Sequence, residues 1–590
     1  MFLRVCSAEP CLVAWVLEFQ KNHGRMNFKD CIFIISFGGL AMISGVSDNF
    51  KVFNQPISSV SVPTAAAVKP ESAPALPSDG LVRSKSGSDG IMSRQMMANG
   101  MAKAESTAQA QATADTSAVS TSSVSSWHQK WGPQVIYFPF TDRFNNGDTS
   151  NDFNVDRSDP RAYHGGDLQG IIDKLDYIHD DVGATCLWLG PLYDNTDEKP
   201  WGTSGYHGYW IKDHYAVDEH LGTMDKAKEL VSKAHEKGMK VVLDTVLNHT
   251  SPDHQWTKDP SKSSWFHHNG GIRNWEDAWQ LENGDVCGLP DLDQHNPETY
   301  KFLLDNTLWW IKETGADGIR LDAIKHVDHQ FWGQFCADIR KEMGEDFMIL
   351  GEALHGDPNI VSQYQRDGMD SCFDMPLYYT IRDTIGKDGS AREIGRRFAE
   401  DSKYPDASKM VTLLDNHDFE RFLNNTNNSR GHDKLMMGMD LIMTCRGIPS
   451  IYYGDETGLT GGGDPDNRHD MNFGENPHIT EHLHKLSATR AAMPALQFGE
   501  QMEMWQDDQV YAFCRRHEGQ ECITVLNNSY DHQTRDIPLR EGSPLHDGDV
   551  MVDVLTGDEF TVRNNKVNVG TADKHGRVLV PKKDYGNIKF

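Results

Sequence analysis

Acidic and basic side chains follow short apolar segments in two neighbouring parts of this sequence. Arg320 and Asp322 lie two residues apart in Gly318-Ile-Arg-Leu-Asp-Ala-Ile-Lys-His326, and Glu352 follows Met348-Ile-Leu-Gly. In a strand, a spacing of two places both side chains on the same face. A buried charged pair is costly unless pairing or function retains it. Taken alone, the pair is equally compatible with a structural ion pair and with a reactive site.

Two further apolar segments end in the same residue types. Asp244 precedes Asn248 and His249, and Asn416-His417-Asp418 follows Met410–Leu414. Carboxylates and histidines from several strands can hold a metal for hydrolysis, or they can supply acid–base and nucleophilic chemistry on a sugar. The apolar residues before Glu352 and around Asp322 predict raised carboxyl pKa values, which suit a general acid.

The elements that must position these groups alternate between strands and helices. The predicted strands are Val135–Phe140, Thr185–Leu189, Lys240–Leu243, Gly318–Leu321, Met348–Leu350, Ser371–Phe373, Met410–Leu414 and Ile448–Tyr453. Helices are predicted over Met224–Lys237, Pro297–Thr314 and Gln330–Met343. The pattern predicts a TIM (β/α)8 barrel, whose functional groups gather at the carboxyl ends of the strands. The rival is an open doubly wound sheet, but no glycine-rich dinucleotide fingerprint follows the first strand.

Composition divides the chain into four parts. Residues 1–47 contain an apolar run at 31–46 after Lys21, Arg25 and Lys29, and resemble a secretory signal; an uncleaved membrane anchor is the rival interpretation. Residues 48–127 are rich in Ser, Ala and Thr and predict a disordered linker. The barrel is expected over residues 128–500, with a small subdomain inserted after strand 3 at about 250–296. Residues 501–590 predict a C-terminal antiparallel β-sandwich.

The net charge of −29 argues against nucleic acid and anionic membranes as partners. From the signal-like run at 31–46 we expect a secreted protein, extracellular or periplasmic, that is monomeric and free of the membrane in its mature form. Removal of the signal would leave seven cysteines, an odd and scattered set that is not a disulfide framework. Cys514 and Cys522 flank a predicted hairpin turn and could pair.

Four segments, in order, resemble the motifs of the α-amylase family of glycoside hydrolases. They are Asp244-Thr-Val-Leu-Asn-His249, Gly318–His326, Gly351-Glu352 and Leu414-Asp-Asn-His-Asp418. Leu289-Pro-Asp-Leu-Asp293 and Gly447-Ile-Pro-Ser-Ile-Tyr-Tyr-Gly454 extend the resemblance, which covers about residues 133 to 590. Such an enzyme would hydrolyse α-1,4-glucosidic bonds in starch, glycogen and maltooligosaccharides.

The resemblance implies roles for the carboxylates. Asp322 matches the nucleophile that forms a covalent glycosyl intermediate, and Glu352 matches the general acid and base. Asp418 matches the third carboxylate, which binds sugar hydroxyls and stabilises the oxocarbenium-like transition state. Arg320 would keep Asp322 ionised by pairing with it. Retaining chemistry needs the nucleophile and acid about 5 to 5.5 Å apart.

Further residues match substrate contacts of the family. Tyr209 would stack on the sugar at the cleavage site, with His207 as its polar neighbour; the alternative is a core aromatic cluster. His249 and His417 would donate hydrogen bonds to that sugar. Two more pairs would bind neighbouring sugar units. Asp464 and Arg468 would hold a more distant glucose, and Lys325 and His326 would face the leaving group.

Two sets of oxygen-bearing residues lead us to expect two calcium sites, because calcium binds six to eight oxygen ligands. The first follows from the resemblance: the side chains of Asn248 and Asp291 and the backbone carbonyl of His326. The second is indicated by oxygen-bearing side chains clustered around glycines, and it resembles the second calcium loop of cyclodextrin glucanotransferases. Its residues are Asn146, Asp148, Asn151, Asp152, Gly165 and Asp167. The alternative is an Asx-rich turn that needs no metal.

Four features bear on the kind of family member. Ala323 and the Leu-Pro-Asp-Leu form of the inserted motif resemble α-1,4-acting amylases. Cyclodextrin-forming members carry an aromatic residue where this chain has Cys287, and they extend well beyond the first sandwich. We therefore expect a linear-product, endo-acting α-amylase. A glucanotransferase or maltogenic enzyme is the alternative, and a non-enzymatic amylase-like ectodomain is the remote one.

Overall fold

The computed structural model describes residues 3–5, 12–15, 31–36, 39–44, 51–53, 124–427 and 430–590. The chain divides into two compact units, residues 1–70 and 71–590. In the first, β1 (Leu3–Val5), β2 (Leu12–Trp15), β3 (Cys31–Ser36), β4 (Gly39–Ser44) and β5 (Lys51–Phe53) pair in sequence order as an antiparallel sheet. Most of the expected linker, residues 54–123, lies outside the described residues. No described helix is both long and apolar enough to span a membrane.

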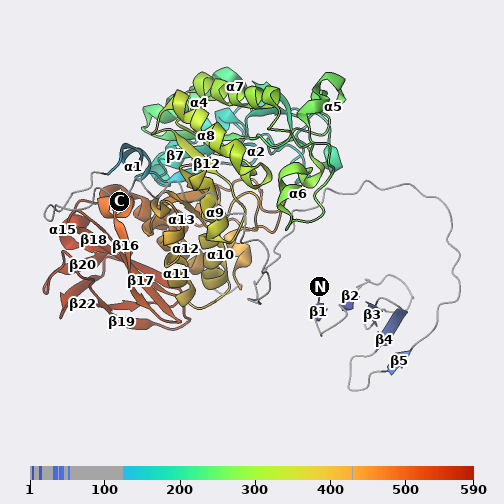
Figure 1. Ribbon diagram of the computed structural model, residues 1–590. Helices are drawn as coiled ribbons and strands as arrows, with labels where there is room; N and C mark the ends of the chain where they lie inside the picture. Colours follow the sequence, from blue (N-terminus) through green and yellow to red (C-terminus); the bar gives the residue numbers. More distant parts are fainter. Residues whose placement is uncertain are drawn as a thin grey trace, which may run out of the picture. The chain divides into compact units, whose positions relative to one another are not determined.

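The second unit contains the predicted (β/α)8 barrel (Figure 1). Its strand order is β13-β12-β11-β10-β7-β6-β15-β14, every pairing is parallel, and a bridge between Phe373 and Val411 joins the two ends. The strands are β6 (Ile136–Phe138), β7 (Cys186–Leu189), β10 (Lys240–Thr245), β11 (Gly318–Leu321), β12 (Met348–Gly351), β13 (Ser371–Cys372), β14 (Val411–Leu413) and β15 (Ile448–Tyr452). All eight predicted strands are confirmed, with bounds shifted by at most two residues.

Helices follow the strands and bury one apolar face against them. α7 (Pro297–Thr314) has the predicted bounds: the Asn296 side chain accepts hydrogen bonds from the N–H groups of Glu298 and Thr299, and Gly315 ends the helix at φ 77°. The others around the barrel are α1 (Ser126–Trp131), α2 (Thr141–Phe144), α3 (Leu168–Asp173), α4 (Met224–Glu236), α8 (His329–Met343), α9 (Pro358–Arg366), α10 (Met375–Ile381), α11 (Arg392–Phe398), α12 (Gly431–Thr444), α13 (Pro477–Ala492) and α14 (Pro494–Phe498).

Two segments of irregular chain rise from the barrel next to the predicted site. The segment at 250–296 carries α5 (Gln255–Lys258) and α6 (Ala278–Asn283), and single bridges join His249 to Asp291 and Phe266 to Leu292. A second segment, which the sequence did not predict, is an antiparallel ribbon of β8 (Tyr193–Asn195) and β9 (Ile211–Val217).

The C-terminal part forms an eight-stranded antiparallel sheet system in the order β16-β17-β18-β23-β20-β21-β22-β19. Its strands are β16 (Glu500–Gln506), β17 (Val510–His517), β18 (Gln520–Asn527), β19 (Gln533–Pro538), β20 (Val550–Asp553), β21 (Glu559–Arg563), β22 (Lys566–Thr571) and β23 (His575–Pro581), followed by α15 (Lys582–Tyr585). The suggested Cys514–Cys522 pairing is wrong, since both thiols are free. They pack into different hydrophobic clusters, because Cys514 opposes Ile523 while Cys522 opposes Arg515.

Candidate active site

A single buried guanidinium joins the carboxylates at the ends of three adjacent strands. Arg320 on β11 donates through Nη1 to Asp322 Oδ1 at 2.7 Å and to Asp244 Oδ1 at 2.8 Å. Its Nη2 lies 2.8 Å from Glu352 Oε2. The strand register explains the convergence, because Asp244 on β10 and Leu350 on β12 both flank Arg320. The predicted common face of Arg320 and Asp322 is therefore observed.

Burial and charge act against each other on these acids. Burial raises the pKa of Asp322, and the Arg320 charge opposes that rise. Burial also raises the pKa of Glu352; Arg320 again opposes the rise and the Asp322 charge adds to it. Glu352 Oε2 accepts a hydrogen bond from the N–H of Ala323 at 3.3 Å. Repulsion between the two carboxylates acts on both, so the pair favours a state in which one of them is protonated.

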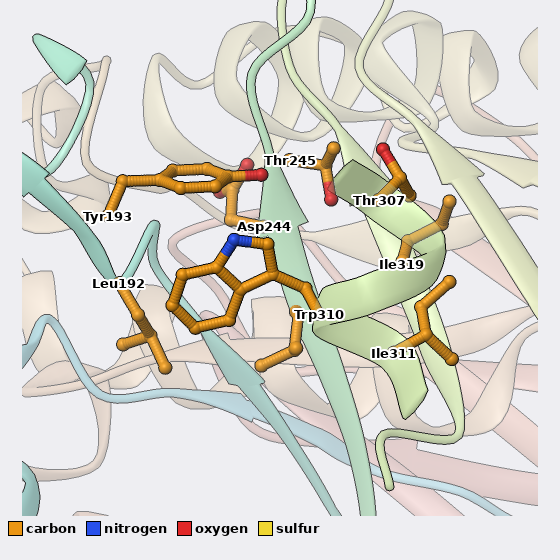
Figure 2. Close-up of a pocket in the computed structure, with 9 residues that line it drawn as sticks. Leu192, Tyr193, Asp244, Thr245, Thr307, Trp310, Ile311 and Ile319 are labelled. Atoms are coloured by element: carbon orange, nitrogen blue, oxygen red, sulfur yellow. The ribbon is translucent and has the colours of Figure 1, made fainter. Parts of the chain in front are cut away.

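Asp244 supports this cluster from behind. Its Oδ2 accepts hydrogen bonds from the Tyr209 hydroxyl at 2.9 Å and from Trp188 Nε1 at 3.2 Å. Burial raises its pKa to about 7, with Arg320 opposing. A small cavity of ≈ 10 Å³ lies between Asp244 and α7, and Figure 2 shows Trp310 and Tyr193 lining it. The cavity is lined by β10 and α7 and shares only Asp244 with the carboxylates around Arg320.

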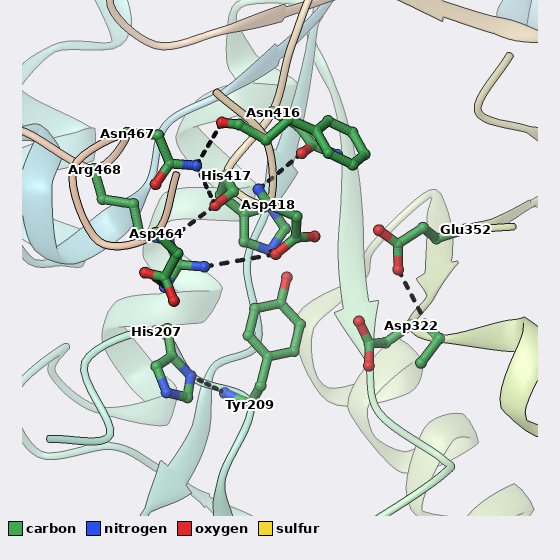
Figure 3. A network of polar contacts seen from close by, with 12 residues as sticks. His207, Tyr209, Asp322, Glu352, Asn416, His417, Asp418, Asp464, Asn467 and Arg468 are labelled. Carbon is green, nitrogen blue, oxygen red and sulfur yellow. Dashed lines mark hydrogen bonds and ion pairs between the residues drawn. The ribbon is translucent and has the colours of Figure 1, made fainter. Parts of the chain in front are cut away.

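Asp418 lies next to His417, and Glu352 and Asp322 lie to one side of it (Figure 3). Its Oδ1 is 3.5 Å from Arg468 Nη2 and 3.4 Å from His417 Nε2. Burial raises the pKa of Asp418 well above its usual range, and the charge of Glu352 adds to the shift. The His417 ring stacks on Tyr209 at 5.2 Å between centroids and an 8° interplanar angle. One face of Tyr209 is thus supported by His417, while Tyr209 remains partly exposed.

The turn that carries Asp418 is fixed by a residue that the sequence did not single out. Asn467 is fully buried, and its Nδ2 donates to the carbonyls of His417 at 2.6 Å and Phe419 at 2.7 Å. Arg421, also fully buried, donates through Nε to the carbonyl of Asn467 at 2.9 Å. Asn467 directly precedes Arg468, a predicted substrate contact, and this position in the sequence was the only signal that could have pointed to Asn467.

The remaining predicted contacts lie near the same residues. Arg468 pairs with Asp464 at 3.0 Å. His207 Nδ1 accepts from the N–H of Tyr209 at 3.1 Å, and His249 Nε2 lies 3.1 Å from the Tyr209 carbonyl. Burial lowers the pKa of His249 to about 4 and that of His207 well below its usual value, which favours neutral rings at both positions.

Lys325 and His326 lie in the loop that follows Asp322. Lys325 Nζ donates to the carbonyl of Leu354 at 3.2 Å, and burial lowers its pKa. His326 Nδ1 lies 3.0 Å from the carbonyl of Leu281 on α6. These contacts place both side chains between the strand ends that carry Asp322 and Glu352 and the inserted segment.

The expected ligands of the first calcium site converge. One terminal atom of the Asn248 carboxamide lies 2.8 Å from the carbonyl oxygen of His326 and 3.2 Å from Asp291 Oδ1. With nitrogen in that place, the amide would donate to both groups. With oxygen there, three oxygens face one another without a hydrogen between them, an arrangement that a hard cation would stabilise. The set contains one carboxylate, and among the described residues no three His, Cys, Asp or Glu side chains group as a metal site.

Part of the second expected set also comes together. Asn146 Nδ2 donates to Asp152 Oδ1 at 2.8 Å. The Oδ1 atoms of Asn146 and Asn151 are buried and, within the described residues, lack a hydrogen-bond partner. A Cβ at Gly165 would lie 2.5 Å from Asp152 Oδ1, so the backbone closes onto this loop only because it is glycine. Unpaired buried oxygens beside a carboxylate fit a cation ligand set.

The other two carboxylates of that set are engaged by hydrogen-bond donors. Asp148 Oδ1 accepts from the N–H of Ser150 at 3.0 Å and from its hydroxyl at 2.6 Å. Asp167 caps α3 by accepting from the N–H of Gly170 at 2.6 Å, and it also accepts from the N–H of Asp148 at 2.8 Å. These contacts fix the loop around Asn146 and Asp152.

Comparison with known proteins gives one consistent family. The family described as the catalytic domain of alpha amylase matches residues 138–494. A "Beta/alpha-amylase" of Paenibacillus polymyxa is 42% identical over 475 residues, which are 78% of this chain and 38% of that protein's length. A cyclomaltodextrin glucanotransferase of Klebsiella oxytoca is 33% identical over 460 residues, covering 67% of this chain and 70% of that protein.

Two solved α-amylases share the architecture. An Anoxybacillus α-amylase has a TM-score of 0.72 at 39% identity, covering 76% of this chain and 98% of its own. The α-amylase of Geobacillus thermoleovorans, solved with acarbose, has a TM-score of 0.71 at 35% identity, covering 77% and 99%.

A solved glucanotransferase shares this architecture as well. CldA, described as a cyclomaltodextrin glucanotransferase with a three-domain ABC distribution, has a TM-score of 0.69 at 32% identity, covering 78% of this chain and 99% of its own. Such a compact glucanotransferase removes chain length as an argument against cyclisation. The alpha amylase match spans more than half of the sequence and includes Asp322, Glu352 and Asp418, so the chain belongs to the α-amylase family of glycoside hydrolases.

Proposed function

We propose that this protein is a secreted, endo-acting α-amylase that hydrolyses α-1,4-glucosidic bonds with retention of configuration. The observation that carries the proposal is the shared guanidinium of Arg320, which contacts Asp322 at 2.7 Å and Glu352 at 2.8 Å. A nucleophile must be ionised and an acid must be protonated at the same pH. One fixed cation beside two buried carboxyls favours a state in which one is ionised and the other protonated.

The chemistry would proceed in two displacements. Asp322 attacks the anomeric carbon while Glu352 protonates the departing glycosidic oxygen, so that one C–O bond forms as the other breaks. Glu352, now ionised, then removes a proton from water, which attacks the same carbon and releases Asp322. Asp418 and its partner Arg468 would hold hydroxyls of the sugar whose ring passes through the oxocarbenium-like state.

An α-glucan is the substrate class that this cleft suits. Tyr209 offers a partly exposed aromatic face near the three carboxylates, and the Asp464–Arg468 pair lies on the side of Asp418 away from Glu352 (Figure 3). Aromatic faces with a few convergent polar groups are typical of sites for such ligands. The Geobacillus relative binds acarbose, which supports an oligosaccharide ligand here.

We also propose that calcium binds at two places. At the first, Asn248, Asp291 and the His326 carbonyl would tie the inserted segment to the loop that follows the nucleophile. At the second, Asn146, Asn151 and Asp152 would supply oxygens. Bound calcium would neutralise the facing oxygens and stiffen both loops. No step of the reaction passes through either metal.

A glucanotransferase is the second candidate, favoured by the Klebsiella and CldA relatives. Cys287 argues for hydrolysis: it is half-buried in a cluster with Trp210, Val286 and Leu289 and offers no aromatic ring at that position. Transferases must hold a sugar acceptor in place of water, and an exposed aromatic side chain is one means of doing so.

Product analysis separates the candidates. The full chain is incubated with soluble amylose, with calcium and then with chelator, and the products are resolved over time. Linear maltooligosaccharides of mixed length at early times support endo hydrolysis, and their loss on chelation supports the calcium sites. Cyclic products would assign the transferase. A folded protein that gives no product with calcium present would point to the non-enzymatic ectodomain.

A further inference from the structure

Two buried acids, Asp415 and Asp455, lie behind the turn that carries Asp418. Both residues are 2% exposed. Asp415 follows β14 and comes three residues before Asp418, whereas Asp455 follows β15 and begins the loop that leads to Arg468. The two acids therefore belong to the loops that leave the last two barrel strands, and what joins them decides how these loops are held.

A single fully buried cation, Arg421, faces both acids. Its Nη1 lies 3.6 Å from Asp455 Oδ1 and 4.0 Å from Asp415 Oδ1, and neither distance is that of a hydrogen bond. The donors of Arg421 point elsewhere: Nη1 donates to the carbonyl of Tyr453 at 2.6 Å, and Nε donates to the carbonyl of Asn467 at 2.9 Å. Arg421 therefore supplies one positive charge for two buried acids and no hydrogen bond to either.

The two oxygens of Asp415 differ in what they accept. Oδ2 accepts a hydrogen bond from the N–H of Phe422 at 2.5 Å. Oδ1 is buried and, within residues 124–427 and 430–590, has no amide or hydroxyl donor. The side chain that reaches Asp415 with a hydrogen bond is the carboxyl of Asp455. An ionised carboxylate can only accept, so this bond exists only when one of the two acids is protonated.

Burial and repulsion both favour that proton. Burial raises the pKa of Asp455 well above its usual range; the charge of Asp415 adds to the rise and Arg421 opposes it. Burial also raises the pKa of Asp415, again with Arg421 opposing. Two buried acids that share one cation are most stable with a single negative charge between them.

The other titratable groups around the two acids do not provide the missing donor. They are Tyr137 on β6, Tyr452 and Tyr453 on β15, and Glu456 directly after Asp455. Glu456 Oε1 accepts from the Tyr137 hydroxyl at 2.6 Å, and its Oε2 accepts from the N–H of Gly454 at 2.9 Å. None of these groups donates to Asp415 Oδ1. The contact between Asp415 and Asp455 thus depends on a proton of its own.

This contact closes the turn around Asp418. The hydrogen bond from Phe422 to Asp415 joins the two ends of residues 415–422, and Asp418 lies between them. Arg421, in the same turn, donates to the carbonyl of Asn467, whose amide holds the carbonyls on both sides of Asp418. Asn467 belongs to the loop after β15, so the turn and that loop are joined at two places.

We propose that Asp415 and Asp455 share one proton and act as positioning residues, joining the loops after β14 and β15 so that Asp418 and Arg468 face the same sugar. The effect on the sugar rests on the proposed α-glucan hydrolysis, whereas the shared proton does not. The folded chain keeps this proton at pH values at which an exposed aspartate has released it. Unfolding then releases the proton, so the free energy of unfolding declines with rising pH until the folded pair itself ionises.

The first test compares wild type with Asp455→Asn by urea unfolding at several pH values. The asparagine amide can donate to Asp415 Oδ1 in place of the acid, but it has no proton to release. The unfolding equilibrium constant of wild type, divided by that of Asp455→Asn, is expected to rise about tenfold per pH unit above the pKa of an exposed aspartate. A ratio that stays constant from about pH 5.5 to 7.5 would show that both acids are ionised in the folded protein and would overturn the proposal.

Asp553 on β20 is the matched control, because it is a fully buried aspartate whose oxygens already have donors. Its Oδ1 accepts from the N–H of Val578 at 3.0 Å, and its Oδ2 accepts from Arg577 Nη1 at 2.8 Å. The same ratio measured for Asp553→Asn is expected to stay constant over the same pH interval. An equal rise in this control would mean that any buried aspartate gives the effect, and the assignment to Asp455 would fall.

The second test asks whether the pair positions Asp418. In Asp455→Ala, kcat/KM for 4-nitrophenyl α-maltotrioside is expected to fall about tenfold or more, because the turn loses its closure. Asp455→Asn should recover most of this loss, since the amide restores the donor. Equal losses in the two variants would overturn the positioning role. If Asp455→Ala does not fold, full loss of activity in folded Asp455→Asn would overturn it instead.

The two tests fail separately from the proposed function. A wild-type protein that cleaves no α-glucan would contradict the hydrolase, while the unfolding ratio would still decide on the shared proton. An active enzyme with a constant ratio would keep the hydrolase and remove the proton from Asp415 and Asp455.

Discussion

Asn467 offers a sharp test of how the Asp418 turn is held. Its Nδ2 donates to the carbonyls on both sides of Asp418, at 2.6 Å to His417 and 2.7 Å to Phe419. Asn467→Ala removes both donors from a fully buried place, although Arg468 Nε still donates to the His417 carbonyl at 3.0 Å. A buried carbonyl left without its donor costs about 1–3 kcal/mol. We expect the free energy of unfolding to fall by that amount.

Asn467→Asp should be worse than Asn467→Ala, although aspartate has nearly the volume of asparagine. A carboxylate would place oxygen within 2.7 Å of two carbonyl oxygens, in a buried position where it could not donate. The expected order of stability is therefore Asn, then Ala, then Asp. Because the turn carries Asp418, kcat/KM should fall in the same order, by about 100-fold for a displacement of 1 Å.

The assay combines urea unfolding with kcat/KM on 4-nitrophenyl α-maltotrioside for both variants. Asn424 is the matched control, since it is exposed and its Nδ2 makes only a 3.4 Å contact with Glu420. Its Ala and Asp variants should stay within about 0.5 kcal/mol of wild type. If Asn467→Asp were more stable or more active than Asn467→Ala, side-chain volume rather than hydrogen-bond donation would hold the turn, and our reasoning would be refuted.

Three further predictions concern charge and metal. Arg320→Lys should lower kcat about 100-fold or more while the far-ultraviolet circular dichroism is unchanged, because one ammonium cannot reproduce the separate Nη1 and Nη2 contacts; activity within a few-fold of wild type would contradict this. Burial and the Asp322 charge raise the pKa of Glu352, so kcat/KM should fall as pH rises through that pKa. The free energy of unfolding should also decline with rising pH, because the unfolded chain releases this proton at lower pH than the folded one. Profiles of kcat/KM and of unfolding free energy against pH measure both effects, and a flat alkaline limb of kcat/KM would exclude Glu352 as the acid. Asn248→Ala should abolish the gain in Tm that calcium gives at this site, as measured by calorimetric scans with calcium and with chelator; an unchanged calcium response would remove Asn248 from the ligand set.

The barrel could be predicted because its strands are nearly continuous apolar runs and its helices have clear ends. For α7, the cap at Asn296 and the left-handed Gly315 fix both bounds in the sequence itself. The ribbon of β8 and β9 was missed, because Tyr193–Asn195 is only three residues long and Ile211–Val217 is half polar. Its pairing depends on contact with the barrel rather than on local pattern.

The candidate site divides in the same way. Asp322, Glu352 and Asp418 follow strand ends, where parallel strands must bring side chains together. Asn467 and Arg421 act through backbone carbonyls, and no sequence pattern reveals which carbonyl a buried amide or guanidinium will meet. The cysteine suggestion failed for a geometric reason: residues that flank a hairpin turn pair only when they lie opposite each other, and Cys514 opposes Ile523.

The single guanidinium of Arg320 among Asp244, Asp322 and Glu352 affects how many protons these buried acids hold. If all three acids were ionised, one positive charge would face three negative ones in a buried place, so burial favours a proton on the cluster before any sugar arrives, and the proposed mechanism places it on Glu352. Under the proposed mechanism that proton leaves with the departing sugar and is restored from water at the end of each cycle. The folded protein would therefore already hold the proton that cleavage requires, and it would not need to take one from solvent at that moment.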